Sequence, residues 1–158
     1  MNKKEKIIIF DFDGVFVSNF DFHKKNIENF LNISITDEEF YNIHSGNVYK
    51  DDKHGLELGN FDALEYFRTI HDEFVKLPIV DGMVQVAESA QEIGKTFVVS
   101  SGGENNMRDF FVENCICENL CTIYGVETHP SKEKKFEKII DETGVSSDNI
   151  IFVTDTLG

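Results

Sequence analysis

The sequence predicts an α/β fold with a mainly parallel sheet, and three observations carry this prediction. Short aliphatic and aromatic runs alternate with segments of helical periodicity along most of the chain, as in proteins built from strand-helix-strand units. Three of the four runs end abruptly in Asp, Ser or Thr, as buried parallel strands do where they leave a sheet. One long segment, residues 17–77, breaks the alternation and has the apolar spacing of helices.

We predict four strands, at residues 7–10, 96–99, 122–126 and 150–153, of which 122–126 is the weakest. The others are unbroken apolar runs of the kind found in a sheet that is covered on both faces. Because the carboxyl ends of parallel strands meet at one edge of the sheet, the polar residues that follow these runs should lie together.

Helices are predicted between these strands, at residues 83–93, 105–115 and 132–143. The first follows Asp81-Gly82, and the last is closed by Gly144, a residue suited to the left-handed conformation at a helix end.

The segment 17–77 is predicted to be a helical insertion. Thr36-Asp37-Glu38-Glu39 fits a capping box at the start of one helix. Asn60 is a candidate N-cap for a further helix, whose apolar residues recur at helical spacing: Leu64, Phe67, Ile70 and Phe74.

Charge and length limit the classes of function. The chain has 15 basic and 29 acidic residues, a net charge of −14, and no acidic tail. Nucleic-acid binding is not expected, because it needs a basic face and lysines cluster only at residues 3–6 and 132–138. No apolar stretch reaches the length of a membrane span or of a signal-peptide core, so we predict a cytoplasmic location and no membrane partner.

The three cysteines, Cys115, Cys117 and Cys121, lie close together in a segment rich in apolar residues. An odd number of cysteines without a signal peptide indicates reduced thiols. Their spacing lacks the paired C-x-x-C of zinc sites and no histidine is near, so we favour small buried apolar residues over a metal site.

Asp11-Phe12-Asp13-Gly14, directly after the first strand, is the most informative motif. Two carboxylates one residue apart repel each other unless a cation or a catalytic task keeps them together. Magnesium suits them, because it takes oxygen ligands and needs few of them from protein. One carboxylate could attack phosphorus while the other handles the leaving-group proton. The alternative is a strand-end turn, since Asp and Gly are common turn residues.

Other strand ends and one helix start offer matching chemistry. The Ser100 hydroxyl and the amides of Ser101 and Gly102 could hold a phosphoryl oxygen, the alternative being a helix N-cap. Lys132 lies at the expected start of a helix, where a positive charge opposes the helix dipole. Its ammonium could neutralise the nucleophilic carboxylate and the phosphoryl group, and the alternative is that it belongs to a solvated lysine face. Asp155 is the natural further metal ligand or a loop cap.

Read in this order, the motifs resemble the four motifs of the haloacid dehalogenase-like superfamily, and the match spans the whole chain. The Asp-x-Asp-Gly motif is the specific one, and it is similar to that of phosphoglycolate phosphatase and β-phosphoglucomutase-like members. The resemblance implies a Rossmann-like core with helices on both faces, formed by residues 1–16 and 78–158. It also implies a helical cap at residues 17–77.

The resemblance also implies roles by position. Asp11 would be the nucleophile and a magnesium ligand, and Asp13 the acid-base residue that also offers its main-chain carbonyl to the metal. Lys132 would stabilise the phospho-aspartate, with Lys134 as the alternative if the alignment shifts. The remaining positions would bind phosphate and metal: Ser100, Ser101 and Gly102 the phosphoryl group, and Asp155 the magnesium ion.

The implied function is magnesium-dependent hydrolysis of a small-molecule phosphomonoester through an aspartyl-phosphate intermediate, with a small phosphorylated metabolite as partner. Three alternatives are a phosphoglucomutase-like phosphoryl transferase, a receiver-like phospho-acceptor module and a catalytically impaired fragment. Two departures from the family pattern bear on this expectation. Thr154 replaces the glycine usual before the last aspartate, and the chain stops at Gly158, before an expected second acidic residue and the last strand of the core. We therefore expect weakened magnesium binding.

Substrate choice should depend on the cap, where the sequence gives little guidance. Several basic residues could face a substrate, although each is more typical of surface or packing positions: His23, Lys24, His44, Lys50, His54, Arg68 and His71. Arg68 is favoured among them for an anionic group, because a guanidinium binds oxyanions through two donors. Arg108 is expected to be structural.

Overall fold

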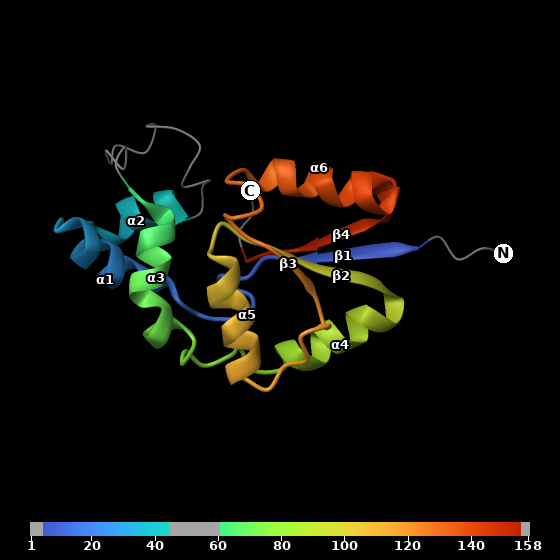
Figure 1. Ribbon diagram of the computed structural model, residues 1–158, viewed down its shortest axis with the longest axis horizontal. Coiled ribbons are helices and arrows are strands. Elements are labelled where there is room, and N and C mark those ends of the chain that lie inside the picture. Colours follow the sequence, from blue (N-terminus) through green and yellow to red (C-terminus); the bar gives the residue numbers. More distant parts are fainter. Residues whose placement is uncertain (1–4, 45–60, 156–158) are drawn as a thin grey trace.

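The computed structural model describes residues 5–44 and 61–155. Within these ranges the core is a four-stranded sheet in the order β3-β2-β1-β4, in which every neighbouring pair is parallel (Figure 1). The predicted α/β class and parallel sheet are therefore confirmed. The strands are β1 (Lys6–Phe10), β2 (Gly94–Val99), β3 (Thr122–Tyr124) and β4 (Ile150–Val153).

Three strands differ from the predicted ranges, and β1 does so only by beginning one residue earlier, at Lys6. β2 begins at Gly94, earlier than predicted, and follows the preceding helix without a loop. β3 ends at Tyr124 because the next two amides leave the ladder: the Gly125 amide donates to Glu104 Oε1 at 3.0 Å, and the Val126 amide donates to the Gly102 carbonyl at 2.9 Å. These contacts hold the loop after β3 against the loop after β2.

The sheet is covered by helices on both faces. α6 (Lys132–Thr143) lies on one face, and α4 (Met83–Ile93) and α5 (Glu104–Glu113) lie on the other (Figure 1). The bounds of α4 and α6 agree with the prediction, and Gly144 closes α6 in the left-handed conformation at φ 65°. α5 ends earlier than expected, and the chain turns at Cys115, which has φ 56°.

Alternation along the strands separates the core into two layers. Ile7 and Ile9 of β1 pack with Ile139 of α6, whereas Ile8 and Phe10 belong to the larger cluster on the opposite face. Successive side chains of a strand point to opposite faces, so β1 contributes apolar residues to both layers. This is why its sequence is an unbroken apolar run rather than an alternating one.

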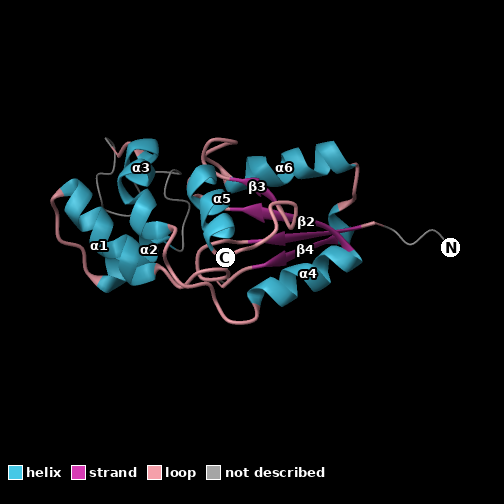
Figure 2. Cartoon of the chain, turned by 60° about the horizontal axis from the view of Figure 1, so that its bottom comes forward, coloured by secondary structure: helices cyan, strands magenta, loops and turns pink. Residues whose placement is uncertain are grey.

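Three helices lie beyond the carboxyl ends of the strands, α1 (Phe20–Leu31), α2 (Asp37–His44) and α3 (Ala63–Phe74) (Figures 1 and 2). The capping box before α2 is confirmed, because the Thr36 amide donates to Glu39 Oε2 at 2.8 Å and the Glu39 amide to Thr36 Oγ1 at 3.2 Å. The proposed cap residue Asn60 lies outside the described residues.

The N-cap of α3 is Asp62, whose carboxylate accepts from the Glu65 amide at 3.0 Å.

Helices α1 to α3 and the sheet share one apolar cluster. Phe12, just after β1, stacks on Phe74 of α3 with ring centroids 5.9 Å apart. Val17 is fully buried and bridges to Ile79. The expected division into a core of residues 1–16 and 78–158 and a cap of residues 17–77 stays a prediction.

The cysteine prediction holds for one residue of three. Cys121 is buried, and burial raises the pKa of its thiol to about 11. Cys115 and Cys117 are exposed, whereas Ile116 between them is the residue that this turn buries in the core. In the described ranges no three His, Cys, Asp or Glu residues gather closely enough to hold a metal ion, and no helix is long and apolar enough to cross a membrane.

Candidate active site

Asp11 follows β1 and lies at the centre of the site. Its amide donates to the Val153 carbonyl at 2.8 Å, which continues the pairing of β1 with β4 by one residue. Its side chain is buried, with Oδ1 accepting from the Phe12 amide at 2.9 Å and Oδ2 lying 2.7 Å from Lys132 Nζ. Burial raises the pKa of the Asp11 carboxyl, and the ammonium of Lys132 opposes this shift.

The lysine beside Asp11 is Lys132 and not Lys134. Lys132 is the first residue of α6, and its ammonium reaches down to the end of β1. Lys134 is exposed and pairs with Glu137 at 2.7 Å on the outer side of the helix. Because successive residues of a helix point in different directions, a shift of two positions moves a side chain off the site.

Asp13 connects the loop after β1 with helices α1 and α3. Its Oδ1 accepts from Asn19 Nδ2 at 2.6 Å and lies 3.7 Å from His23 Nε2. The other nitrogen of His23, Nδ1, lies 2.7 Å from the hydroxyl of the buried Tyr66 on α3. A network of polar side chains therefore runs from Asp13 through His23 on α1 to α3.

Ser100 follows β2 and is fully buried. Its Oγ accepts from the Gly102 amide at 3.0 Å and lies 3.4 Å from Asp13 Oδ2. Its own amide donates to the Tyr124 carbonyl at 3.0 Å, which fixes the loop to the end of β3. Ser101 is half-buried in the same loop.

Asp155 follows β4 and lies over Gly14, which has φ 74°. A Cβ atom on Gly14 would lie only 1.9 Å from Asp155 Oδ2, so the absence of a side chain at Gly14 makes room for this carboxylate. The preceding hydroxyl, Thr154 Oγ1, is 3.5 Å from Asp11 Oδ2. The carboxyl ends of β1, β2 and β4 and the start of α6 thus bring all the predicted site residues to one edge of the sheet.

The family-wide sequence profile of haloacid dehalogenase-like hydrolases matches residues 8–157. The chain belongs to the haloacid dehalogenase-like hydrolase family. This membership confirms the resemblance drawn from the motifs and makes the chain an enzyme of a hydrolase family. No curated protein matches the sequence significantly.

Solved structures share the fold of this hydrolase at low sequence identity. One is a haloacid dehalogenase-like family hydrolase, SP0104, from Streptococcus pneumoniae, with a TM-score of 0.69 and 13% identity over 97% of this chain and 77% of that chain. A predicted phosphoglycolate phosphatase from Haemophilus somnus has a TM-score of 0.67 and 15% identity over 96% and 77% of the two chains. YfnB from Bacillus subtilis, bound to magnesium, has a TM-score of 0.62 and 12% identity over 98% and 81%.

Lys135 is a residue of this hydrolase that sequence reasoning missed. It is fully buried, and its ammonium donates to the main-chain carbonyl of Ser100. Burial, with a smaller contribution from the charge of Lys132, lowers the pKa of Lys135 to about 8. A signal for its burial exists in the sequence, because Lys135 is four residues before the buried Ile139 and so lies on the same face of α6.

Several residues predicted as substrate contacts pair with carboxylates that are not among the site residues. Arg68 is largely exposed and contacts Glu65, with Nη1 and Oε2 3.4 Å apart, and Lys24 pairs with Asp37 at 2.9 Å. His71 pairs with Asp109 of α5 at 2.8 Å. Two of the predicted residues, Lys50 and His54, and the side chain of His44 lie outside what the structure describes.

Arg108 is exposed and contacts Asn105, one turn before it on α5, with Nη1 3.4 Å from Oδ1; its expected structural role stays a prediction.

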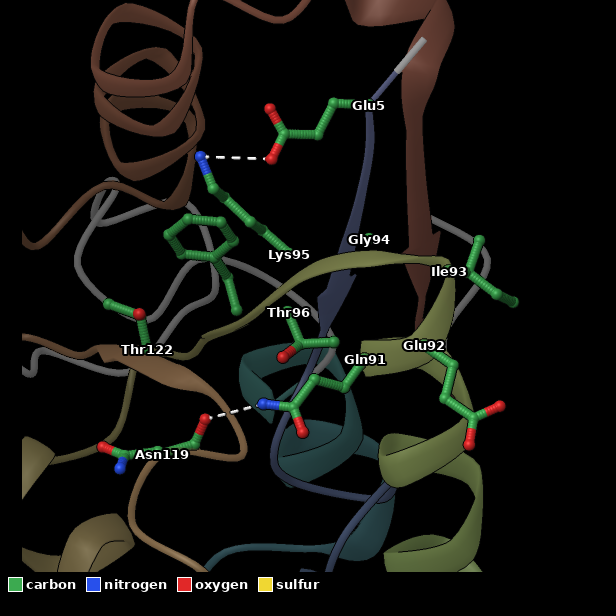
Figure 3. A pocket seen from close by; sticks show the side chains of 10 residues that line it. Glu5, Gln91, Glu92, Ile93, Gly94, Lys95, Thr96, Asn119 and Thr122 are labelled. Atoms are coloured by element: carbon green, nitrogen blue, oxygen red, sulfur yellow. Dashed lines mark hydrogen bonds and ion pairs between the residues drawn. The ribbon is translucent and has the colours of Figure 1, made fainter. Parts of the chain in front are cut away.

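A separate pocket lies around the start of β2, at the other end of that strand from Ser100 (Figure 3). It is lined partly by ion-paired and hydrogen-bonded side chains: Lys95 is 3.2 Å from Glu5, and Gln91 Nε2 donates to the Asn119 carbonyl at 2.9 Å. The pocket contains none of the predicted site residues.

Proposed function

We propose that this hydrolase is a phosphatase that cleaves small-molecule phosphomonoesters through an aspartyl-phosphate intermediate. The observation that supports this function best is the convergence of Asp11, Asp13, Ser100 and Lys132 from three separate parts of the chain. A buried carboxylate paired with a lysine and set beside a second carboxylate and a hydroxyl is suited to covalent phosphoryl transfer.

In the first step, a carboxylate oxygen of Asp11 attacks phosphorus, and the bond between phosphorus and the ester oxygen breaks. Asp13 gives its proton to the leaving alkoxide. In the second step, Asp13 takes a proton from the attacking water, the acyl-phosphate bond breaks, and inorganic phosphate leaves Asp11 free. Lys132 balances negative charge on Asp11 in both steps, because its ammonium is 2.7 Å from Oδ2.

The positions of the other polar groups support these roles. Asn19 and Ser100 hold the Asp13 carboxylate from two sides, with contacts of 2.6 and 3.4 Å. The Ser100 hydroxyl and the loop through Ser101 and Gly102 would bind the phosphoryl oxygens. His23 lies near Asp13 and would help to orient its carboxylate.

We propose that magnesium binds to the carboxylates of Asp11 and Asp155 and to the main-chain carbonyl of Asp13. The contact between Asp155 and Gly14 fits this assignment, because a side chain at Gly14 would occupy the place of that carboxylate. Two carboxylates suffice, since magnesium keeps several water ligands and also binds substrate phosphate. The ion would screen the charge of the phosphoryl group and of the attacking carboxylate.

The proposed partner is a small phosphorylated metabolite. A net charge of −14 disfavours nucleic acid as a substrate, whereas a single phosphoryl group meets the local positive charge of the site. The cytoplasmic location expected from the sequence stays a prediction.

The test is a magnesium-dependent phosphatase screen over sugar phosphates, phosphoglycolate and nucleotides with the wild type and the variant Asp11→Asn. We expect the variant to lose about a thousandfold or more in kcat/KM, because the amide is a poor nucleophile. Asp141→Asn, which makes the same chemical change at an exposed position of α6, is the matched control and should retain full activity. Equal activity of wild type and Asp11→Asn would reject the assignment of the nucleophile.

The intermediate itself can be tested separately. Acid quenching during turnover should trap a phosphate group on the peptide that contains Asp11 in the wild type. The same peptide from Asp11→Asn should carry none. Phosphate trapped on a different peptide would exclude the proposed chemistry even if the chain is an active phosphatase.

A further inference from the structure

Lys135 has an unusual place for a charged residue. It is fully buried under α6, against the loop that follows β2. Its ammonium donates to the main-chain carbonyl of Ser100, and within the described ranges it forms no ion pair with a carboxylate. A buried ammonium without a paired carboxylate is costly, because burial removes its hydration.

The surroundings of Lys135 add to that cost. Lys132, one turn earlier on the same helix, repels it, and the start of a helix disfavours positive charge. Burial and this repulsion lower the pKa of Lys135 to about 8, whereas Glu104, Asp11 and Glu127 oppose the shift from a distance. The ammonium is thus largely charged at neutral pH.

We propose that Lys135 is a positioning residue for phosphate: it holds the Ser100 loop in its binding geometry and provides a second positive charge behind the phosphoryl site. This inference rests on the proposed function of the site as a phosphatase. It assigns to Lys135 a role separate from that of Lys132, which contacts the Asp11 carboxylate directly.

The geometry gives each of the two lysines its own partner. Lys132 and Lys135 are three residues apart and so project from the same side of α6. The first contacts the end of β1 at Asp11, and the second contacts the end of β2 at Ser100. A phosphoryl group held between Asp11 and the Ser100 loop would therefore lie near two cations, Lys132 beside Asp11 and Lys135 behind Ser100.

The hydrogen bond to the Ser100 carbonyl also bears on the other contacts of this loop. The same residue uses its Oγ to accept from the Gly102 amide at 3.0 Å and approaches Asp13 Oδ2 to 3.4 Å. Release of the carbonyl would let the loop rotate and would change both contacts. Lys135 thus acts on phosphate through Ser100 and not by direct contact.

The test measures binding of inorganic phosphate by calorimetry in the presence of magnesium, which does not depend on turnover. Lys135→Met removes both the charge and the donor, and Lys135→Gln removes the charge but keeps an amide donor. Lys134→Met is the matched control, because it removes the neighbouring charge at an exposed position. We expect Lys135→Met to bind phosphate about tenfold more weakly, Lys135→Gln to lie between it and the wild type, and Lys134→Met to be unchanged.

Thermal unfolding of the same variants separates this role from a structural one. Lys135→Met should melt at or above the wild-type temperature, because methionine fills the buried space without an ammonium to desolvate. Weaker phosphate binding in a protein of undiminished stability supports the proposal. If Lys135→Met does not fold, the phosphate affinity of Lys135→Gln decides whether the proposal holds.

Wild-type phosphate affinity in the folded variants overturns the inference, as does a wild type that binds no phosphate. Failure of the phosphatase proposal is a different result. In that case Asp11→Asn and the wild type would have equal turnover, while the effect of Lys135 on phosphate binding would still be measured.

Discussion

Replacing Gly14 by alanine tests the placement of Asp155 over the loop after β1. Gly14 has φ 74°, a conformation that costs a residue with a Cβ roughly 1–2 kcal/mol. The new Cβ would also lie 1.9 Å from Asp155 Oδ2 and 2.4 Å from its Cγ, distances at which atoms cannot coexist. The carboxylate of Asp155 must therefore move away.

A matched control separates the two effects. Gly82 has φ 82°, and a Cβ there would meet nothing within 4 Å. Gly82→Ala should thus have the backbone cost without the displacement of a carboxylate. For a chain of this size, the shared cost corresponds to a fall of roughly 2–8 °C in the melting temperature of each variant.

The two variants should differ in magnesium binding. We expect Gly14→Ala to lose about tenfold to a hundredfold in magnesium affinity, since the displaced Asp155 is one of two proposed carboxylate ligands. Titration calorimetry measures this affinity, and the rise of the melting temperature with added magnesium checks it independently. Equal magnesium affinity in Gly14→Ala and Gly82→Ala would refute the proposed role of Asp155.

Three further predictions concern burial and charge. The unfolding free energy of the wild type should rise by about 3 kcal/mol relative to Lys135→Met between about pH 8 and pH 10.5. The reason is that the pKa of Lys135 is lowered in the folded state, so the unfolded chain binds more protons in this window. Urea unfolding of both proteins across this pH range tests the prediction. Hydrogen bonds to Asp72 and Asp109 raise the pKa of His71. His71 should therefore stabilise the fold below the ordinary histidine pKa of 6.5, and this stabilisation should be lost as the pH rises through the raised value. The stabilisation should be less than about 1 kcal/mol at this partly exposed position, as measured by comparing the unfolding free energies of the wild type and His71→Gln. Asn106→Ala should cost about 1 kcal/mol in chemical denaturation, since it removes a buried hydrogen bond of 2.9 Å between the Asn106 amide and the main-chain carbonyl of Phe67 on α3.

Much of the fold could be predicted from local patterns. The unbroken apolar run of residues 7–10 predicts a strand covered on both faces, and alternate residues of this strand do pack into two separate apolar clusters, one on each face of the sheet. Helix bounds followed from local signals where these were strong, as at Gly144. They failed at α5, where the left-handed conformation of Cys115 ends the helix early in a sequence with no glycine or proline to mark it.

The candidate site could be predicted as a set of positions but not as a set of contacts. The order of the motifs places Asp11, Ser100 and Asp155 at strand ends, and parallel strands bring their carboxyl ends to one edge. The choice between Lys132 and Lys134 needed the rotation of α6 about its axis, which the sheet sets through the burial of Ile139.

By itself the sequence determined the class of fold, the order of the strands and helices along the chain, and the residue types available for phosphoryl chemistry, because these depend on local periodicity and composition. Only the tertiary structure decided that Lys135 is buried against the Ser100 loop, that Gly14 makes room for Asp155, and that His23 links Asp13 to Tyr66 of α3. Each of these contacts joins residues whose distance depends on strand register and helix packing, and neighbouring residues in the sequence carry no information about either.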